Sequence, residues 1–232
     1  MIPTKIDSSR YPWLPYVAPM AAFLLLTSAE DSLTKAMPGL WGYPIAYAIK
    51  IALVVIVAVL CRDTWRDLKP LPSASMFAVA IVAGLAVTAL WIGLDGRYPA
   101  IPLLGKRSGF DPTTLPVPGR FVFLAVRFLG LVLVVPLIEE LFWRSFLMRW
   151  LIDSDFRTIP IGRVTRVAVV ITSFGFALEH PEWLPALLTG LIWAGLLAWS
   201  KSVFACVVSH ATANLALGAY VLAMGGEAWR FL

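Results

Sequence analysis

The chain of 232 residues is too apolar for an ordinary water-soluble domain. Hydrophobic residues make up 59% of it, charged residues make up only 14%, and the mean hydropathy is +0.81. Soluble domains carry about 25% charged residues, which argues strongly against a soluble single-domain enzyme. The net charge of +5 comes from basic residues scattered between apolar runs, a pattern typical of membrane-flanking loops and not of a nucleic-acid interface. We therefore expect an all-α, polytopic membrane protein that contacts the lipid bilayer and no nucleic acid.

Seven apolar runs follow one another along the chain, and each is a candidate transmembrane helix. In order they are residues 14–27, 44–61, 75–94, 120–150, 164–180, 184–200 and 203–224. A helix that crosses the hydrocarbon core needs about 20 residues, so we expect seven or eight such helices in a single integral membrane domain over residues 1–232. The polar N-terminal stretch leads into an apolar run without a small-residue cleavage site, so we expect the first helix to be retained.

The predicted loops on the two sides of the membrane differ in their number of basic residues. Ten Lys and Arg lie in the segments on the N-terminal side of the predicted membrane, and six lie in those on the other side. The positive-inside rule then predicts a cytoplasmic N-terminus.

Cys61 and Cys206 each lie in or at the edge of an apolar run, which argues against a disulfide framework and against a multi-cysteine metal site.

A few charged or strongly polar residues lie inside the apolar runs. Burial there costs roughly 2.5 to 3.5 kcal/mol for each charge, so each is a functional candidate. They are Lys50, Arg127, Glu139, Glu140, Arg144, Glu179, His180, His210 and Asn214. At about 1.5 Å per helical residue, measured from basic residues at one membrane face, Glu139, His180 and His210 lie at similar depth. We predict that three helices bring these groups into one polar cavity, because isolated groups at that depth would lack partners.

Spacing along each predicted helix separates the roles of these residues. Glu140 and Arg144 are four residues apart on one face, so we expect an internal ion pair that anchors the helix. Glu139 is turned by about 100° from that face, and we expect it to point into the cavity as a general base. His210 and Asn214 are also four residues apart, and such neighbouring hydrogen-bond donors suit the stabilisation of an oxyanion.

The surroundings of the first histidine indicate a break in its helix. Phe176 lies one turn before His180, and we expect it to pack on the imidazole. Pro181 disfavours helical geometry at the residue before it, and such a break is tolerated at membrane depth only where it lines protein or water. Lys50 and Arg127 have no partners at helical spacing, and we expect them to snorkel or to pair locally.

Three short motifs occur in order in the C-terminal half. They are Glu139-Glu140-x-x-x-Arg144, Phe176-x-x-x-His180 and His210-x-x-x-Asn214. In residue type, order and hydrophobic setting they resemble the motifs of the CPBP family, which comprises the CAAX prenyl proteases and bacteriocin-processing enzymes. The resemblance covers a core of about residues 120–222. The segments EHPEW, LLTGL and SHATANL also resemble the bacterial CAAX protease-related proteins associated with exosortase systems.

The resemblance implies an intramembrane endopeptidase of the bacterial cytoplasmic membrane that needs no cofactor. Its substrate would be a membrane-associated or lipidated peptide or protein. In the family a glutamate helped by a histidine activates water, while a second histidine and an asparagine hold the oxyanion. Carried over to this chain, Glu139 is the base, His180 is its partner, and His210 with Asn214 supplies the oxyanion donors.

Three alternatives use the same part of the chain differently. Cys206, His210 and Asn214 lie at successive turns of one predicted helix and could form a cysteine nucleophile with its base and orienting residue. Glu139, His180 and His210 could instead be zinc ligands around a catalytic water, although the HExxH spacing is missing. The third alternative is a non-enzymatic transporter or scaffold whose polar cluster relays protons or binds a partner.

Overall fold

The fold was analysed in a computed structural model, which describes residues 10–37, 39–105 and 109–231. This part of the chain contains nine α-helices and no β-strand, so the predicted all-α class is confirmed. The helices are α1 (Leu14–Ala36), α2 (Gly42–Leu60), α3 (Ala74–Leu94), α4 (Val117–Leu129), α5 (Val135–Glu140), α6 (Met148–Trp150), α7 (Arg166–Leu178), α8 (Trp183–Ser200) and α9 (Val203–Met224).

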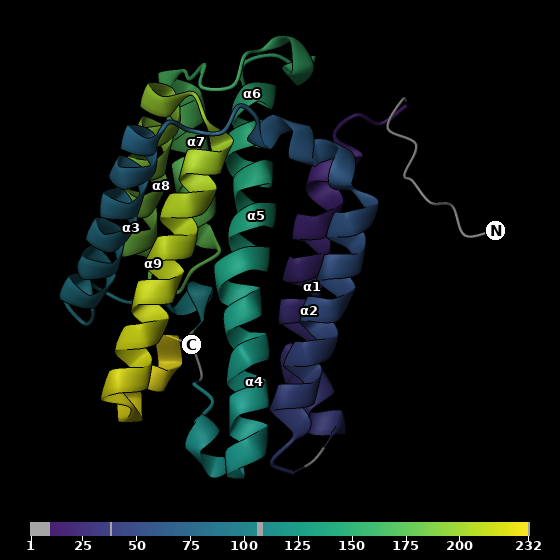
Figure 1. The fold of residues 1–232 in the computed structure, drawn as a ribbon, viewed down its shortest axis with the longest axis vertical. Coiled ribbons are helices and arrows are strands. Elements are labelled where there is room, and N and C mark those ends of the chain that lie inside the picture. The colour runs from purple at the N-terminus through teal and green to yellow at the C-terminus, as the bar shows by residue number, and fades with distance from the viewer. Residues whose placement is uncertain (1–9, 38, 106–108, 232) are drawn as a thin grey trace.

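One long helical column runs through the bundle, as Figure 1 shows for α4, α5 and α6. These helices are joined without a loop by two π-helical segments, η4 (Gly130–Val134) and η5 (Leu141–Leu147). π-Helical turns are rare in proteins and occur frequently at functional sites. Here the two segments flank Glu139 and Glu140, the last residues of α5.

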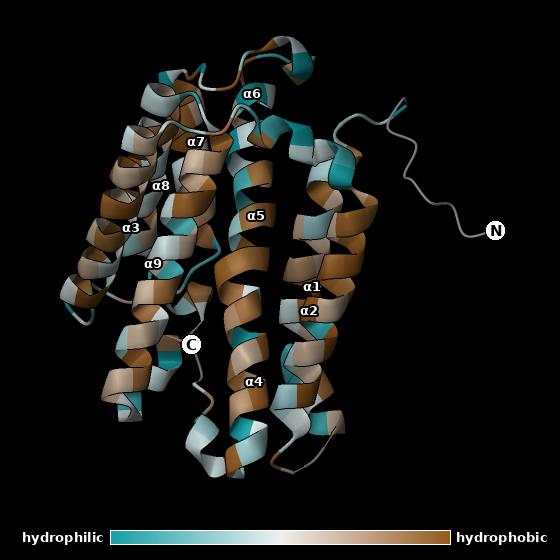
Figure 2. Ribbon diagram, in the orientation of Figure 1, coloured by the Kyte–Doolittle hydropathy of each residue, from teal (hydrophilic) through white to brown (hydrophobic). Residues whose placement is uncertain are grey.

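The protein is polytopic, but two of the seven predicted spans differ from the others. Five segments of the described chain are long and apolar enough to cross a membrane: Gly42–Leu60, Ala74–Leu94, Val117–Trp150, Trp183–Ser200 and Val203–Met224. Their apolar residues cover the middle of the bundle, whereas hydrophilic residues gather toward its two ends (Figure 2). α1 is the first difference: it carries Glu30, Asp31 and Lys35 within its 23 residues and is not one of these five segments.

α7 is the second difference from the predicted spans. It has 13 residues. At about 1.5 Å per residue it is roughly 20 Å long, too short for a hydrocarbon core of about 30 Å. A full transmembrane helix over residues 164–180 was therefore a wrong expectation, because the helix stops inside the bundle at Leu178, close to the break that Pro181 predicted.

Close approaches between helices hold the bundle together. Gly84 of α3 lies against α9, where a Cβ atom would collide with the carbonyl oxygen of Ser209. Trp91 Nε1 donates a hydrogen bond to Thr189 Oγ1 of α8 at 2.9 Å. On the other side of the column, a Cβ atom on Gly130 would meet the side chains of α2. The column is thereby packed between the α1–α2 hairpin and the group formed by α3, α8 and α9.

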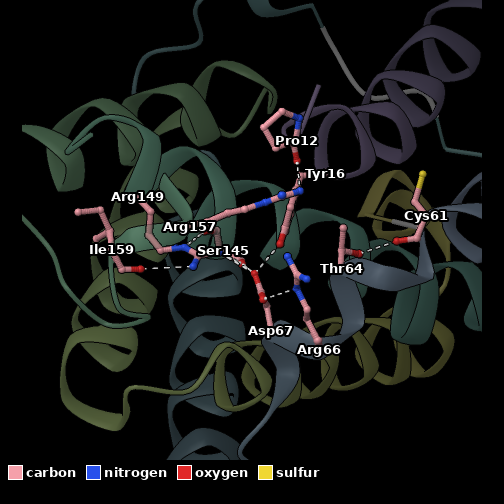
Figure 3. A network of polar contacts seen from close by, with 10 residues as sticks. All are labelled: Pro12, Tyr16, Cys61, Thr64, Arg66, Asp67, Ser145, Arg149, Arg157 and Ile159. Carbon is pink, nitrogen blue, oxygen red and sulfur yellow. Dashed lines mark hydrogen bonds and ion pairs between the residues drawn. The ribbon is translucent and has the colours of Figure 1, made fainter. Parts of the chain in front are cut away.

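A polar network ties the end of the column to the connection between α2 and α3 (Figure 3). Asp67, in the 3₁₀ helix η1 (Arg62–Leu68), accepts hydrogen bonds on Oδ2 from Tyr16 Oη at 2.7 Å and from Ser145 Oγ at 2.6 Å. Arg149 Nη2 donates to the same oxygen at 2.6 Å. Charge-assisted hydrogen bonds of this kind are stronger than neutral ones, so one carboxylate joins α1, η5 and α6.

Candidate active site

A cavity of about 670 Å³ lies inside the bundle, with a lining drawn from α1 to α5 and from α7 to α9. Among its lining residues are the four predicted catalytic side chains, Glu139, His180, His210 and Asn214, together with Phe176. The structure thus brings together polar groups that three separate parts of the sequence contribute. Its volume is within the range of pockets that enclose small-molecule ligands.

Glu140 lies next to this cavity and contacts two side chains. Its Oε2 atom lies 3.1 Å from Arg144 Nε, so the ion pair that the spacing predicted is present and fully buried. Its other oxygen, Oε1, lies 2.9 Å from Nδ1 of His210 on α9. The sequence contained no signal for this second contact, because the two residues are 70 positions apart. Glu140 therefore both anchors its own helix and orients a predicted catalytic histidine.

The His210 ring is held on two sides. Besides the contact with Glu140, it stacks on Trp193 of α8, with ring centroids 4.3 Å apart and an interplanar angle of 29°. Trp193 is itself fixed by a hydrogen bond from Nε1 to Ser209 Oγ at 3.0 Å. With Nδ1 engaged, Nε2 is the ring atom placed to meet a ligand.

His180 lies in the turn between α7 and α8, and its tautomer follows from its partner. Its Nδ1 atom is 2.8 Å from the carbonyl oxygen of Phe176. A carbonyl oxygen only accepts hydrogen bonds, so Nδ1 carries the proton and Nε2 of the neutral ring is an acceptor. The expected packing of Phe176 on this imidazole is present, with ring centroids 4.6 Å apart. The ring of Trp91 of α3 packs on another side of this imidazole, with ring centroids 5.6 Å apart.

Asn214 is oriented by the π-helical segment of the column. Its Nδ2 atom donates a hydrogen bond to the carbonyl oxygen of Leu131 in η4 at 2.8 Å. An asparagine amide has two N–H donors. One of them is used in this bond, so the second can serve a ligand in the cavity.

Aromatic rings connect the buried ion pair to both histidines. The guanidinium carbon of Arg144 lies 5.0 Å from the ring centroid of Phe176 and 5.2 Å from that of Trp193. Phe176 packs on His180, and Trp193 stacks on His210. Cation–π contacts are favourable when they are shielded from water. The positive charge is therefore embedded in the same aromatic layer that positions the two imidazoles.

Charged residues outside the predicted catalytic set also line the cavity. Lys50 Nζ lies 2.9 Å from Oε2 of Glu30, which is the local pairing expected for Lys50. The guanidinium carbon of Arg127 lies 4.3 Å from the ring centroid of Tyr47. Glu179 lines the cavity beside His180. Glu30 was missed because the apolar run of α1 ends at residue 27, so its carboxylate was assigned to a loop.

The cysteine and zinc alternatives can be compared with this geometry. Cys206 is completely buried, its Sγ atom lies 3.6 Å from the carbonyl oxygen of Trp193, and it is not among the residues that line the cavity. In the described part of the chain, no three His, Cys, Asp or Glu side chains are arranged to hold one metal ion. Both alternatives therefore require side chains to move from their positions in this structure.

Comparison with known families gives one match. The family model described as type II CAAX prenyl endopeptidase Rce1-like matches residues 121–216, a range that includes all three motifs. Comparisons with curated proteins and with solved structures gave no match. The exosortase-associated subgroup is not tested by this match and stays a prediction. Residues 121–216 are a domain of the Rce1-like type II CAAX prenyl endopeptidase family, a family of peptidases.

Proposed function

We propose that the protein is an intramembrane endopeptidase that hydrolyses a peptide bond of a membrane-associated or lipidated substrate with water activated by Glu139. The observation that carries this proposal is the meeting of Glu139, His180, His210 and Asn214 on one cavity, inside a domain of a peptidase family. Isolated polar groups at membrane depth are costly, and such groups mark functional sites when they converge.

In the proposed first step, Glu139 removes a proton from a water molecule while its oxygen attacks the carbonyl carbon of the substrate. Nε2 of His180 accepts a hydrogen bond from the O–H that stays on the attacking oxygen, because Nδ1 donates to the carbonyl oxygen of Phe176. The carboxyl group of Glu139 then passes its proton to the nitrogen of the departing amine as the C–N bond breaks. General acid–base catalysis of this kind contributes about 10²- to 10⁴-fold in rate.

Two donors stabilise the oxyanion that forms in this step. Asn214 offers the N–H that is not bound to Leu131. His210 donates from Nε2, which requires the doubly protonated ring, since Nδ1 also carries a proton toward Glu140. The Glu140 carboxylate stabilises that imidazolium. Removing one oxyanion donor from a serine protease lowers kcat by about 10²- to 10³-fold, and we expect an effect of that order here.

The substrate segment enters the cavity in an extended form. Within an α-helix each carbonyl oxygen is hydrogen-bonded to the amide four residues later, which shields the peptide bond from attack. The segment that is cleaved is therefore a disordered tail or a helix end that has unwound.

The decisive test compares Glu139→Gln with Glu227→Gln, a matched substitution of a glutamate whose side chain is 96% exposed. New protein termini in membranes would be identified by mass spectrometry, with each variant at the same protein level as wild type. We expect a set of cleavage products to disappear in Glu139→Gln and to persist in Glu227→Gln. Because a general base contributes about 10²-fold or more, cleavage within about tenfold of wild type in Glu139→Gln would contradict the proposal.

The same membrane preparations distinguish the proposed peptidase from a transporter or scaffold and from a zinc enzyme. A transporter or scaffold would show no cleavage product that depends on Glu139. A zinc enzyme would contain one tightly held metal ion per chain, and its activity would be lost on chelation and regained when zinc is restored. We expect cleavage to survive prolonged chelation, with elemental analysis of the active protein showing less than one zinc per chain.

A further inference from the structure

Glu179 is a carboxylate beside the predicted catalytic residues that the proposed reaction does not use. It follows α7 directly and precedes His180, and both residues line the cavity. Its side chain is partly buried. The Oε2 atom is shielded from solvent and has no hydrogen-bond partner among the residues that the structure describes. Consecutive Cα atoms are about 3.8 Å apart, so this carboxylate belongs to the immediate surroundings of the histidine that is proposed to bind the attacking water.

The cation that interacts with Glu179 is shared with another carboxylate. Arg144 attracts the Glu179 carboxylate, but its Nε atom already lies 3.1 Å from Oε2 of Glu140. A proton on His210 would add a second cation, and the ionised base Glu139 adds a third carboxylate. An excess of negative charge therefore remains on this side of the cavity. Such a charge is costly away from water, so a positive charge that enters the cavity here is stabilised.

Apolar side chains of α3 form the cavity wall beside His180. Trp91 packs on the imidazole with ring centroids 5.6 Å apart. Val87 precedes Trp91 by one helical turn, and both residues line the cavity. A lysine or arginine side chain has an aliphatic stem that packs on apolar surface and a cationic head that binds a carboxylate. An apolar wall next to the Glu179 carboxylate matches both parts of such a side chain.

We propose that Glu179 is a specificity-determining residue that binds a lysine or arginine side chain of the substrate. An extended peptide advances about 3.3 to 3.6 Å per residue, so the basic residue lies within about three residues of the bond that is cleaved. The inference rests on the proposed peptidase function, because it concerns the peptide that this cavity cleaves.

Mapping of cleavage sites tests this specificity in the full-length protein. New protein termini in membranes would be identified by mass spectrometry, and those that disappear in Glu139→Gln define the sites. Glu179→Gln would be compared with Glu182→Gln, because Glu182 belongs to the same turn and is not among the residues that line the cavity. We expect a lysine or arginine close to each site. We also expect cleavage to fall about tenfold or more in Glu179→Gln, as for the loss of a hydrogen bond to a charged group, and to persist in Glu182→Gln at equal protein level.

A charge exchange separates recognition from folding. In one mapped substrate the basic residue would be replaced by glutamine or by glutamate, and each form would be expressed with wild type, Glu179→Gln and Glu179→Lys. We expect wild type to prefer the basic form and Glu179→Lys to prefer the acidic form. Glu179→Gln should cleave the basic and glutamine forms equally, a comparison that is made within one protein and does not depend on its stability.

Two results would overturn the inference and leave the proposed function intact. One is a set of Glu139-dependent sites without a nearby basic residue. The other is a preference for the basic form that persists unchanged in Glu179→Gln. If no terminus depends on Glu139, the proposed function fails, and the specificity that rests on it fails as well.

Discussion

The two polar regions of the cavity neutralise their charges in different ways. In the α1–α2 hairpin, Lys50 of α2 forms an ion pair with Glu30 of α1. Beside the histidines, Glu140 has two partners, Arg144 on its own column and His210 on α9. The first arrangement compensates the buried charge of Lys50. The second also fixes the orientation of an imidazole, so one carboxylate links the column to α9 beside the predicted catalytic residues.

The largest effect is expected from removing Glu140. In Glu140→Ala, Arg144 and the His210 ring lose their buried partner, and stranding a buried charge typically costs about 3 to 5 kcal/mol. We expect a loss of this size in the free energy of unfolding, measured by thermal or denaturant unfolding in one detergent, together with loss of cleavage.

Glu140→Gln sharpens this expectation, because it keeps the shape of the side chain and removes only the charge. Unchanged stability with abolished cleavage in both variants would show that Glu140 acts only by positioning His210. Unchanged stability and unchanged cleavage would contradict the buried ion pair altogether.

A smaller effect is expected at the other polar region. Lys50→Met leaves Glu30 without its cation, but the Glu30 side chain retains 15% exposure. We expect a destabilisation of about 1 to 3 kcal/mol, the range for an unsatisfied buried polar group. Adding Glu30→Gln should restore part of this loss, and cleavage should persist in both variants at equal protein level. Loss of cleavage at unchanged stability would instead place Lys50 in substrate binding.

The close approach between α2 and the column at Gly130 predicts a still smaller effect. A Cβ atom in Gly130→Ala would collide with Tyr47 Oη and approach Ile51 Cδ1 to 2.8 Å. Overpacking costs about 1 to 3 kcal/mol, and the gain in helix propensity offsets about 0.5 to 1 kcal/mol of it. We expect a net loss of about 1 kcal/mol, partly relieved by Tyr47→Phe in a double-mutant cycle of unfolding free energies. Strictly additive effects would show that α2 does not constrain the column here.

The smallest effect is expected from Cys206→Ala. The thiol is buried against the carbonyl oxygen of Trp193 and lies apart from the cavity lining. A small apolar residue preserves most of that packing, so cleavage should remain at the wild-type rate in a membrane peptidase assay. An inactive but stably folded Cys206→Ala protein would support the cysteine nucleophile and contradict water activation by Glu139.

Much of the architecture was predictable because it follows from local properties of the chain. The cost of burying charges explains why the rare polar residues of apolar runs were candidates. Helical spacing was sufficient to predict the pair Glu140–Arg144 and the packing of Phe176 on His180. The length of α7 was predicted wrongly, since an apolar run shows where a helix can form and not where tertiary contacts end it.

What the sequence by itself determined is the all-α membrane class and the order of the three motifs, since hydropathy and helical spacing depend only on the residues along one segment. Only the tertiary structure decided that Glu140 binds His210, that Asn214 is oriented by Leu131, and that Lys50 pairs with Glu30. Each of these depends on the rotation and separation of helices that are distant in the chain. Those quantities are set by packing over the whole bundle, at positions such as Gly84 and Gly130 where backbones approach closely.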